Sequence, residues 1–191
     1  MIQSYLLKKG FASIHGQTIK TSSFGITDES YDLTFDILKG KYPDYKIDST
    51  EYNRVGEASG ILVGGNLALI YALLGTKYSF DFQDKILFIE DIGENFYALD
   101  RMIMSLELAD VFKKIKGLIV GGMTNMGKEN ENKSYEESFD PFVNQIIAER
   151  VSKYDFPTAF NFPNGHIFDN RPLIIGSEIT LKVSNKVVIN F

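Results

Sequence analysis

The sequence predicts an α/β fold with a mixed, partly barrel-like sheet and flanking helices. Apolar runs with the length of buried strands alternate with stretches of helical periodicity between residues 60 and 162. The C-terminal residues form three short alternating runs, at 173–175, 178–183 and 186–191, as in a β-meander. With 191 residues, of which 44% are hydrophobic, the chain can bury a core of its own.

The N-terminal residues predict a helix followed by a strand. Residues 1–9 show the pattern of the last turns of an amphipathic helix, which ends at Gly10. A short strand is expected at 11–14. The opening is too short and too polar for a signal peptide, and the sequence predicts no transmembrane span. Because the chain starts within a helical pattern, we expect it to be a truncated form of a longer protein.

The polar region that follows is expected to connect two domains. It covers residues 16–58 and contains turn sequences at 21–25 and 41–44, with one amphipathic helix at 29–38. Ser59, at its end, lies in a sequence that resembles a nucleophile elbow with the serine one position late. Since no strand is predicted before it, we interpret Ser59 as a turn residue.

The second domain is expected to begin near Gly60. An apolar run at 61–66 leads into a helix at 67–74, which is apolar on nearly all sides and is therefore predicted to be buried. Further helices are expected at 95–111 and 140–154, and Met102 and Met104 are assigned to the core. The polar stretch 125–138 is expected to be a mobile surface loop. Buried strands are predicted at 85–90, 116–122 and 157–162.

Composition and charge argue against several classes of function. The net charge of -5 disfavours nucleic-acid and anionic-membrane surfaces, because phosphate binding needs clustered Lys and Arg. Without cysteine there is no disulfide, thiolate nucleophile or cysteine metal site, and two histidines disfavour a multi-histidine metal site. We therefore expect a cytoplasmic enzyme without metal or cofactor that acts on an acidic or neutral small molecule.

Glu90 and His166 are the strongest candidates for chemistry. Glu90 ends an almost wholly apolar strand, so its carboxylate is either held by a partner or exposed at the end of that strand. His166 follows Asn164-Gly165, a pair that tolerates positive φ and allows close approach of backbone or substrate. Imidazole is the commonest general base, and a carboxylate fixes its tautomer. The two residues could thus supply two members of a catalytic triad, although a lone loop histidine is usually just solvated.

Weaker candidates each have a structural interpretation. Asp91 points to the other face of its strand and is interpreted as a helix-capping or loop residue. Glu94 is interpreted as a first-turn acid favoured by a helix dipole. His15 could line the same cleft as the stronger candidates. Residues 64–66 could bind an anion through free backbone N–H groups, but they lack the spacing of a dinucleotide or P-loop fingerprint.

Five motifs occur in one order along most of the chain. They are Gly64-Gly65-Asn66-Leu67 before a helix that ends in Leu-Leu-Gly-Thr76, Ile86-Leu-Phe-Ile-Glu-Asp-Ile-Gly-Glu94, Leu99-Asp-Arg-Met102, Gly117-Leu-Ile-Val-Gly-Gly122 and Phe162-Pro-Asn-Gly-His166. Each is weak alone, but their ordered combination resembles the LD-carboxypeptidase family of serine peptidases. That family includes the muramoyltetrapeptide carboxypeptidases.

The resemblance implies two domains with an active site between them. A Rossmann-like N-terminal domain carries the serine nucleophile, and a C-terminal domain supplies a glutamate and a histidine. On this basis residues 1–30 are a remnant of the nucleophile domain, 31–58 an interdomain connection and 59–191 the C-terminal domain. Carried over by motif, Glu90 is the triad acid and His166 the base. The family's serine lies in a Gly-Tyr-Ser-Asp-like turn, and no such turn occurs in this sequence.

The activity that the resemblance implies is hydrolysis of the terminal D-alanine amide of cytoplasmic murein tetrapeptides, a step in peptidoglycan recycling. Because loss of the serine lowers turnover about a million-fold in a comparable triad, this chain alone is expected to be inactive. Two alternatives stay open. One is a microcin-immunity-like amidohydrolase of aminoacyl nucleotide conjugates, and the other is a non-catalytic binding module or fragment. A homodimer is also left open, and residues 1–15 are expected to lack a sheet partner and to expose apolar surface.

Overall fold

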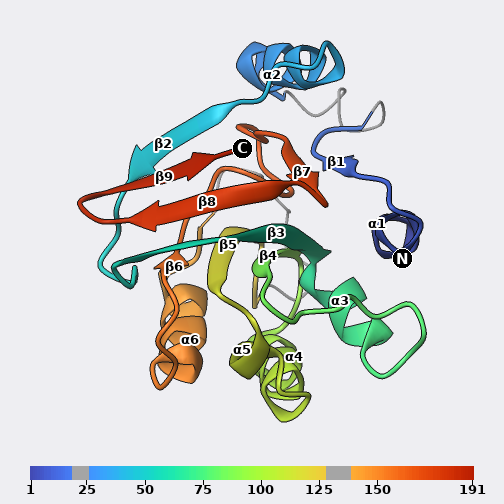
Figure 1. Cartoon of the computed structure of the whole chain (residues 1–191). Coiled ribbons are helices and arrows are strands. Elements are labelled where there is room, and N and C mark those ends of the chain that lie inside the picture. The colour runs from blue at the N-terminus through green and yellow to red at the C-terminus, as the bar shows by residue number, and fades with distance from the viewer. Residues whose placement is uncertain (19–25, 128–138) are drawn as a thin grey trace.

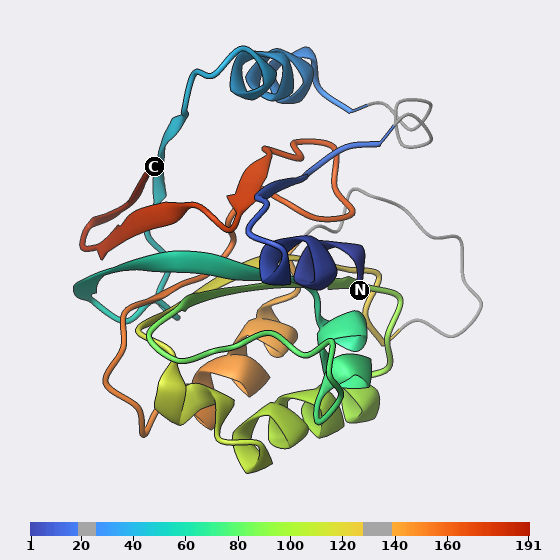
Figure 2. The same ribbon diagram turned by 45° about the vertical axis from the view of Figure 1, so that its right-hand side comes forward.

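Figure 1 shows the computed structural model of the chain, which describes residues 1–18, 26–127 and 139–191. Within these ranges seven strands form one mixed sheet in the order β2-β9-β8-β3-β4-β5-β6, and β1 and β7 form a separate two-stranded ladder. Helices α3 to α6 lie on one side of the large sheet, and α2 lies on the other side with the β1–β7 ladder (Figures 1 and 2). The predicted α/β fold with a mixed sheet is confirmed.

The elements have the following bounds. The helices are α1 (Ile2–Lys8), α2 (Asp28–Leu38), α3 (Leu67–Leu73), α4 (Phe96–Leu108), α5 (Val111–Lys114) and α6 (Pro141–Val151). The strands are β1 (Ser13–His15), β2 (Asp44–Asp48), β3 (Gly56–Asn66), β4 (Ile86–Ile92), β5 (Gly117–Thr124), β6 (Thr158–Ala159), β7 (Leu173–Ile175), β8 (Glu178–Val183) and β9 (Lys186–Asn190).

Strand β3 joins an antiparallel and a parallel half of the sheet. Its first residues, Gly56 to Ile61, pair antiparallel with β8, and its last, Leu62 to Asn66, pair parallel with β4. The buried strands β4 and β5 form the centre of the parallel half, which explains why their sequences are continuous apolar runs. In the described residues the sheet has two edges, β2 and β6, so it does not close into the partly barrel-like form that was expected.

The N-terminal segment has a sheet partner, contrary to the sequence prediction. Strand β1 pairs antiparallel with β7, from Ser13 opposite Ile175 to His15 opposite Leu173. The predicted β-meander is therefore reduced to the β8–β9 hairpin, because β7 leaves the large sheet to pair with β1. The expected exposed apolar surface is present at Ile2 and Phe11, which are 72% and 62% exposed.

The segment 31–58, interpreted as an interdomain connection, contains a strand of the large sheet. Strand β2 pairs with β9 and forms one edge. The helix predicted before it is confirmed as α2, whose first turn is capped by the Thr27 hydroxyl accepting from the backbone N–H of Ser30. The division into 1–30, 31–58 and 59–191 stays a prediction.

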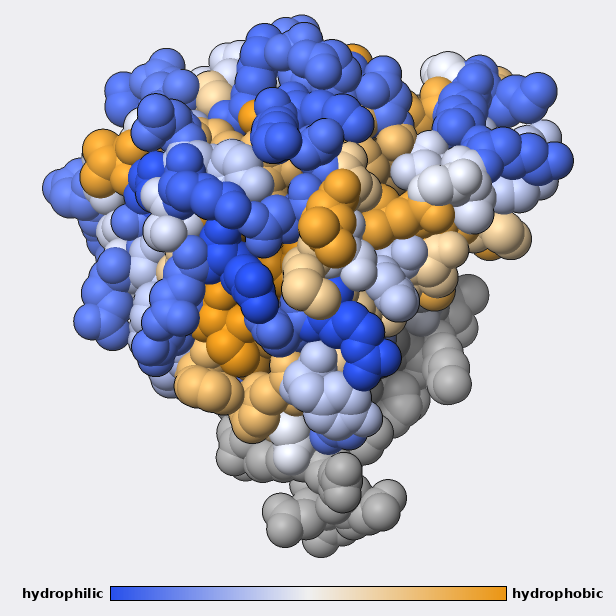
Figure 3. Space-filling view, turned by 90° about the horizontal axis from the view of Figure 1, so that it is seen from below, coloured by the Kyte–Doolittle hydropathy of each residue, from blue (hydrophilic) through white to orange (hydrophobic). Residues whose placement is uncertain are grey.

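Helices α3 and α4 are less buried than their sequences suggest. Helix α3 buries Leu67 and Ile70, whereas Leu69 is 57% exposed, because only one face of this short helix meets the sheet. In α4, Met102 lies in the core and Met104 is 38% exposed. Figure 3 shows this outer face, where hydrophobic patches lie among hydrophilic side chains. In the described ranges, no helix is long and apolar enough to cross a bilayer.

Three further expectations differ from the structure. The helix predicted at 95–111 stops at Leu108, and Asp110, with φ 57°, separates α4 from α5. The strand predicted at 157–162 is reduced to the two residues of β6. Ser59 is not a turn residue, because it lies in β3 opposite Thr180, and the two hydroxyl oxygens are 2.9 Å apart. The turn sequence at 21–25 and most of the loop at 125–138 lie outside the described residues.

Candidate active site

Glu90 lies near the carboxyl end of the parallel strand β4, and its side chain is 1% exposed. Successive side chains of a strand alternate between faces, so Glu90 shares its face with Phe88 and Asp91 takes the opposite one. The carboxyl ends of parallel strands are where open α/β sheets bind their ligands. The buried carboxylate is therefore delivered to the edge of the sheet where a site is expected.

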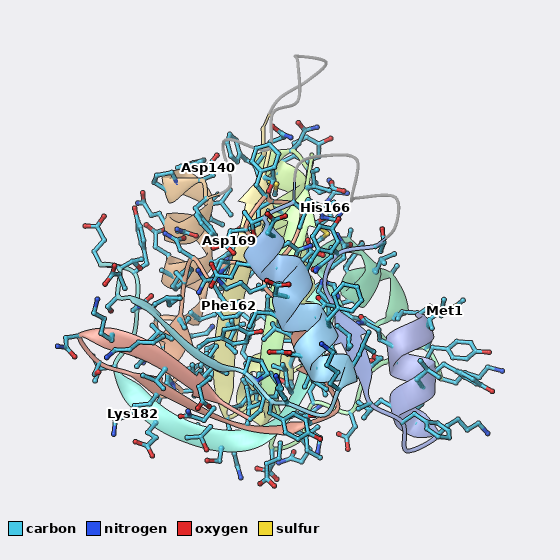
Figure 4. The ribbon with its side chains drawn as sticks, turned by 90° about the horizontal axis from the view of Figure 1, so that it is seen from above. Met1, Asp140, Phe162, His166, Asp169 and Lys182 are labelled. Atoms are coloured by element: carbon cyan, nitrogen blue, oxygen red, sulfur yellow. The ribbon has the colours of Figure 1, made fainter. Side chains whose placement is uncertain are left out.

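His166 meets Glu90 from the loop that connects β6 to β7. Its Nδ1 lies 2.9 Å from Oε2 of Glu90. The loop is fixed by side chains, because Asn164 donates to the carbonyl of Arg171 and the Thr124 hydroxyl donates to the carbonyl of His166. Figure 4 shows His166 from above, far from Lys182 on the antiparallel half of the sheet. The structure thus brings together the two residues that the sequence singled out.

Gly165 makes this contact sterically feasible. Its φ is +125°, and a Cβ at this position would lie 3.0 Å from Oε2 and 3.1 Å from Cβ of Glu90. A glycine before the histidine was expected to allow close approach of backbone or substrate. In the structure the group that approaches is the Glu90 side chain.

His15, a weaker candidate in the sequence, reaches the same carboxylate from β1. Its Nε2 lies 3.6 Å from Oε1 of Glu90, and its Nδ1 lies 3.4 Å from Oε1 of Gln3. The ring also packs against the ring of Phe88 in a T-shaped arrangement, with 5.4 Å between the ring centroids. The sequence suggested that His15, beside Gly16 at the end of a short strand, could line this cleft. Its contact with Glu90 depends on the long-range pairing of β1 with β7, which the sequence did not predict.

A cavity of about 330 Å³ opens beside these three side chains. Gln3 and His15 line it from the N-terminal segment, Asn66 from the end of β3, and Ile167 and Phe168 from the loop that follows His166. Glu90 and His166 contribute to the same wall. The cavity therefore offers a largely apolar space next to an imidazole and a carboxylate, a combination that suits a small polar substrate.

The protonation behaviour of the pair follows from burial and hydrogen bonding. Burial alone raises the pKa of Glu90, but hydrogen bonds and attraction from His15 and His166 outweigh it and lower the pKa to about 2. The hydrogen bond to Glu90 raises the pKa of His166 above its usual 6.5, against the opposing effect of burial. Glu90 is thus held as a carboxylate that stabilises the charged form of the His166 imidazole.

Asp91 serves the start of α3, as its helix-capping interpretation proposed. Its carboxylate accepts from Asn66 Nδ2 at 2.7 Å and from the backbone N–H of Ala68 at 2.9 Å. Burial, together with the nearby charge of Glu90 and against these hydrogen bonds, raises the pKa of Asp91 to about 6. Asp91 therefore orients Asn66, one wall of the cavity, without entering the Glu90–His166 pair.

Two other candidates do not match their interpretations. Glu94 lies two residues before α4, which starts at Phe96, so it is not a first-turn acid. Residues 64–66 are the end of β3 and are paired with β4, so they do not form a free anion-binding turn. Among the described residues, no group of three or more His, Asp or Glu side chains is arranged to hold a metal ion.

The Glu90–His166 pair predicts a pH-dependent contribution to stability. Glu90 has a pKa lowered from 4.5 to about 2, so its stabilisation, on the order of 3 kcal/mol, is present above pH 4.5 and lost as pH falls toward 2. The raised pKa of His166 contributes stability that is present below pH 6.5 and lost as pH rises through its folded-state value. The stabilisation by the pair is therefore greatest between about pH 4.5 and 6.5.

Urea unfolding of the wild type and of Glu90→Gln across pH 2 to 9 measures this contribution as a difference in the free energy of unfolding. The comparison with Glu90→Gln is needed because Asp91 also titrates in this range. Its raised pKa lowers stability as pH rises from about 4 to 6, which is opposite to the effect of Glu90. A difference that stays constant across the whole range would contradict the assigned charge pairing.

The sequence matches a known family model. Residues 59–181 match the LD-carboxypeptidase C-terminal domain. The chain is 28% identical over 185 residues to a probable murein peptide carboxypeptidase from Bacillus subtilis, a match that covers 94% of this chain and 56% of that protein. The chain thus spans little more than half the length of that curated relative.

Solved structures agree with this match. The fold superimposes on a muramoyltetrapeptide carboxypeptidase from Oxalobacter formigenes with a TM-score of 0.83 and 25% identity, covering 100% of this chain and 65% of that one. It also resembles the microcin C7 self immunity protein MccF, with a TM-score of 0.78 and 19% identity over 98% of this chain and 63% of that one. The second likeness concerns the fold alone. The match to the family model over residues 59–181 shows that this chain belongs to the LD-carboxypeptidase family.

Proposed function

We propose that Glu90 and His166 are the acid and the base of a serine-type triad that removes the terminal D-alanine from cytoplasmic murein tetrapeptides. The 2.9 Å contact between Glu90 Oε2 and His166 Nδ1, made beside a cavity, carries this proposal. When Nδ1–H donates to the carboxylate, Nε2 keeps the lone pair that a general base needs. A carboxylate that fixes the tautomer in this way is the arrangement found in serine hydrolases.

In the proposed reaction a hydroxyl group attacks the carbonyl carbon of the L-configured residue that precedes D-alanine. His166 Nε2 takes the hydroxyl proton, and Glu90 stabilises the imidazolium that forms. The imidazolium then returns the proton to the nitrogen of D-alanine as the amide bond breaks. Water hydrolyses the resulting ester by the same route, so the histidine ends in its original state.

The nucleophile is assigned to a segment outside these 191 residues. The sequence contains no Gly-Tyr-Ser-Asp-like turn, and the chain spans 56% of its Bacillus subtilis relative. The donors that would stabilise the tetrahedral oxyanion are assigned to the same segment. On this proposal the chain binds substrate through its half of the site and does not hydrolyse it.

Murein peptides are favoured over aminoacyl nucleotide conjugates as the substrate class. The curated relative is named for murein peptides at 28% identity, whereas the likeness to MccF at 19% identity supports no more than the fold. In addition, Phe168 is the one phenyl ring among the described residues that line the cavity, so stacking of a nucleotide base has little support.

The proposal predicts binding of murein tetrapeptide without release of D-alanine. A titration of the ¹⁵N-labelled chain with tetrapeptide is expected to shift the imidazole signals of His166, while mass spectrometry detects no free D-alanine. The tripeptide that lacks D-alanine and an aminoacyl sulfamoyl adenosine serve as comparison ligands. Preferential binding of the adenosine conjugate would support the alternative hydrolase, and binding of none of the three would contradict the proposed site.

Release of D-alanine by the chain alone would show that a nucleophile lies within the 191 residues. Tetrapeptide binding with no hydrolysis by any longer form would support the non-catalytic binding module instead. The assay therefore separates the three functions that the sequence left open.

A further inference from the structure

Glu90 is shared by both histidines of the chain. Its Oε2 meets His166 Nδ1 at 2.9 Å, and its Oε1 faces His15 Nε2 at 3.6 Å. The first distance is that of a hydrogen bond, whereas the second is slightly longer than a hydrogen bond and becomes an ion pair only when His15 is protonated. The proposed triad uses only the carboxylate oxygen that meets His166. His15, which faces the other oxygen, therefore has no role in the mechanism described above.

The surroundings of His15 hold its ring against this second oxygen. Its backbone carbonyl accepts from Asn164 Nδ2 at 3.0 Å, which ties β1 to the loop that carries His166. The side chain is 19% exposed, and its ring forms a T-shaped pair with the ring of Phe88. A Cβ at Gly65 would lie 3.4 Å from the ring, which is van der Waals contact, so the imidazole packs closely against this part of β3.

The orientation of the ring implies a proton on Nε2. If Nε2 carried a lone pair, it would face the lone pairs of a buried carboxylate, which is unfavourable in a site of low dielectric. Gln3, whose side-chain oxygen lies 3.4 Å from Nδ1, can present either its oxygen or its nitrogen there by rotation of the amide. Nδ1 can therefore be satisfied whether or not it carries a proton.

We propose that His15 is a positioning residue that sets the basicity of His166 through their shared carboxylate. A hydrogen-bond donor or a positive charge at His15 takes part of the interaction that Glu90 would otherwise make with His166. His15 thereby keeps His166 from binding its proton too strongly to act as a base near neutral pH. The coupling between His15 and His166 does not depend on the proposed function. Only the description of His166 as the base rests on it.

The other groups that face Glu90 do not substitute for His15. Asp91, the neighbouring carboxylate, is engaged with Asn66 and the start of α3 on the opposite side of the strand. Gln3 and Asn66 are neutral and line the cavity without a described contact to the Glu90 carboxylate. Within the described residues, His15 and His166 are thus the two groups that can carry positive charge against this carboxylate.

Nuclear magnetic resonance can test this directly because the chain contains two histidines. In the ¹⁵N-labelled wild type, the nitrogen shifts at pH 7 are expected to show a proton on Nε2 of His15. Replacing His15 with phenylalanine keeps a ring against Phe88 but removes the donor, and the pKa of His166 is expected to rise by about 1 unit. Replacing it with glutamine restores a neutral donor, so the rise is expected to be smaller.

Three results would overturn the proposal: a bare Nε2 on His15 in the wild type, an unchanged His166 pKa in His15→Phe, or a fall in that pKa. The first needs no variant, so the test survives if His15→Phe does not fold. A His166→Phe chain assigns the two sets of imidazole signals. These readouts do not depend on hydrolysis, so failure of the murein proposal would leave the measured coupling intact and the two failures can be told apart.

Discussion

Replacing Glu90 with glutamine is expected to lower hydrolysis about 10⁴-fold in an enzyme that contains this domain and the proposed serine, the loss seen when the acid of a comparable triad is amidated. Glutamine has nearly the same shape, but it has one acceptor oxygen where the carboxylate has two, and it carries no charge. It can hold Nδ1–H of His166 only if its amide turns the right way, and it cannot stabilise the imidazolium. The pKa of His166 is expected to fall accordingly.

The measurement is the rate of D-alanine release from murein tetrapeptide by a full-length enzyme and by its Glu90→Gln variant at equal concentration. Circular dichroism confirms that both are folded. Glu94→Gln is the matched control, because Glu94 lies in the loop between β4 and α4 and belongs to neither the pair nor the cavity lining. We expect it to change the rate less than about twofold. Wild-type turnover by Glu90→Gln would remove Glu90 from the mechanism.

The Glu90–His166 contact could be anticipated because each residue carries a local sign of its position. An acid at the end of an apolar run indicates a buried strand that ends at a site, and Asn-Gly before a histidine indicates a turn that presents an imidazole. These signs survive in the structure because β4 is buried on both faces and Gly165 leaves room for the carboxylate. Local sequence patterns were sufficient here because a catalytic triad pairs a histidine with a carboxylate, so finding one residue suggested the other as its partner.

His15 shows where local pattern is insufficient. Three residues of β1 acquire their place by pairing with β7, about 160 positions later in the chain. The same long-range pairing removes β7 from the expected meander. The prediction that Ser59 is a turn residue was wrong for a related reason, because its strand pairs with a distant one and places Ser59 opposite Thr180 on β8. Propensity and periodicity describe a segment and its own faces, but they carry no information about which distant edge a short strand will meet.

At Gly64, both the fold and the candidate site depend on the absence of a Cβ atom. It lies opposite Phe88 in the parallel pairing of β3 with β4, with φ +134°. A Cβ at this position would lie 1.9 Å from the carbonyl oxygen of Phe88, which is a backbone atom and cannot move aside as a flexible side chain can. Two residues further along the same ladder, Asn66 is opposite Glu90.

Gly64→Ala is therefore expected to destabilise the protein by about 3 to 5 kcal/mol, through backbone strain and a steric clash of comparable size. For a chain of this length the melting temperature should fall by about 10 °C or more. Gly75→Ala is the matched control: its φ is +73°, but its Cβ would meet nothing within 4 Å, so the strain alone should cost about 1 kcal/mol. Thermal and urea unfolding compare the two variants.

Any Gly64→Ala protein that remains folded must have moved β3 away from β4, and this movement alters the site as well as the core. The Asn66 side chain would lose its place against Asp91, and the wall of the cavity beside Glu90 would shift. We therefore expect the His166 imidazole signals to change in Gly64→Ala and to stay at wild-type positions in Gly75→Ala. Equal stability losses in the two variants would mean that the close approach of β3 to the Phe88 carbonyl does not hold the parallel half of the sheet together.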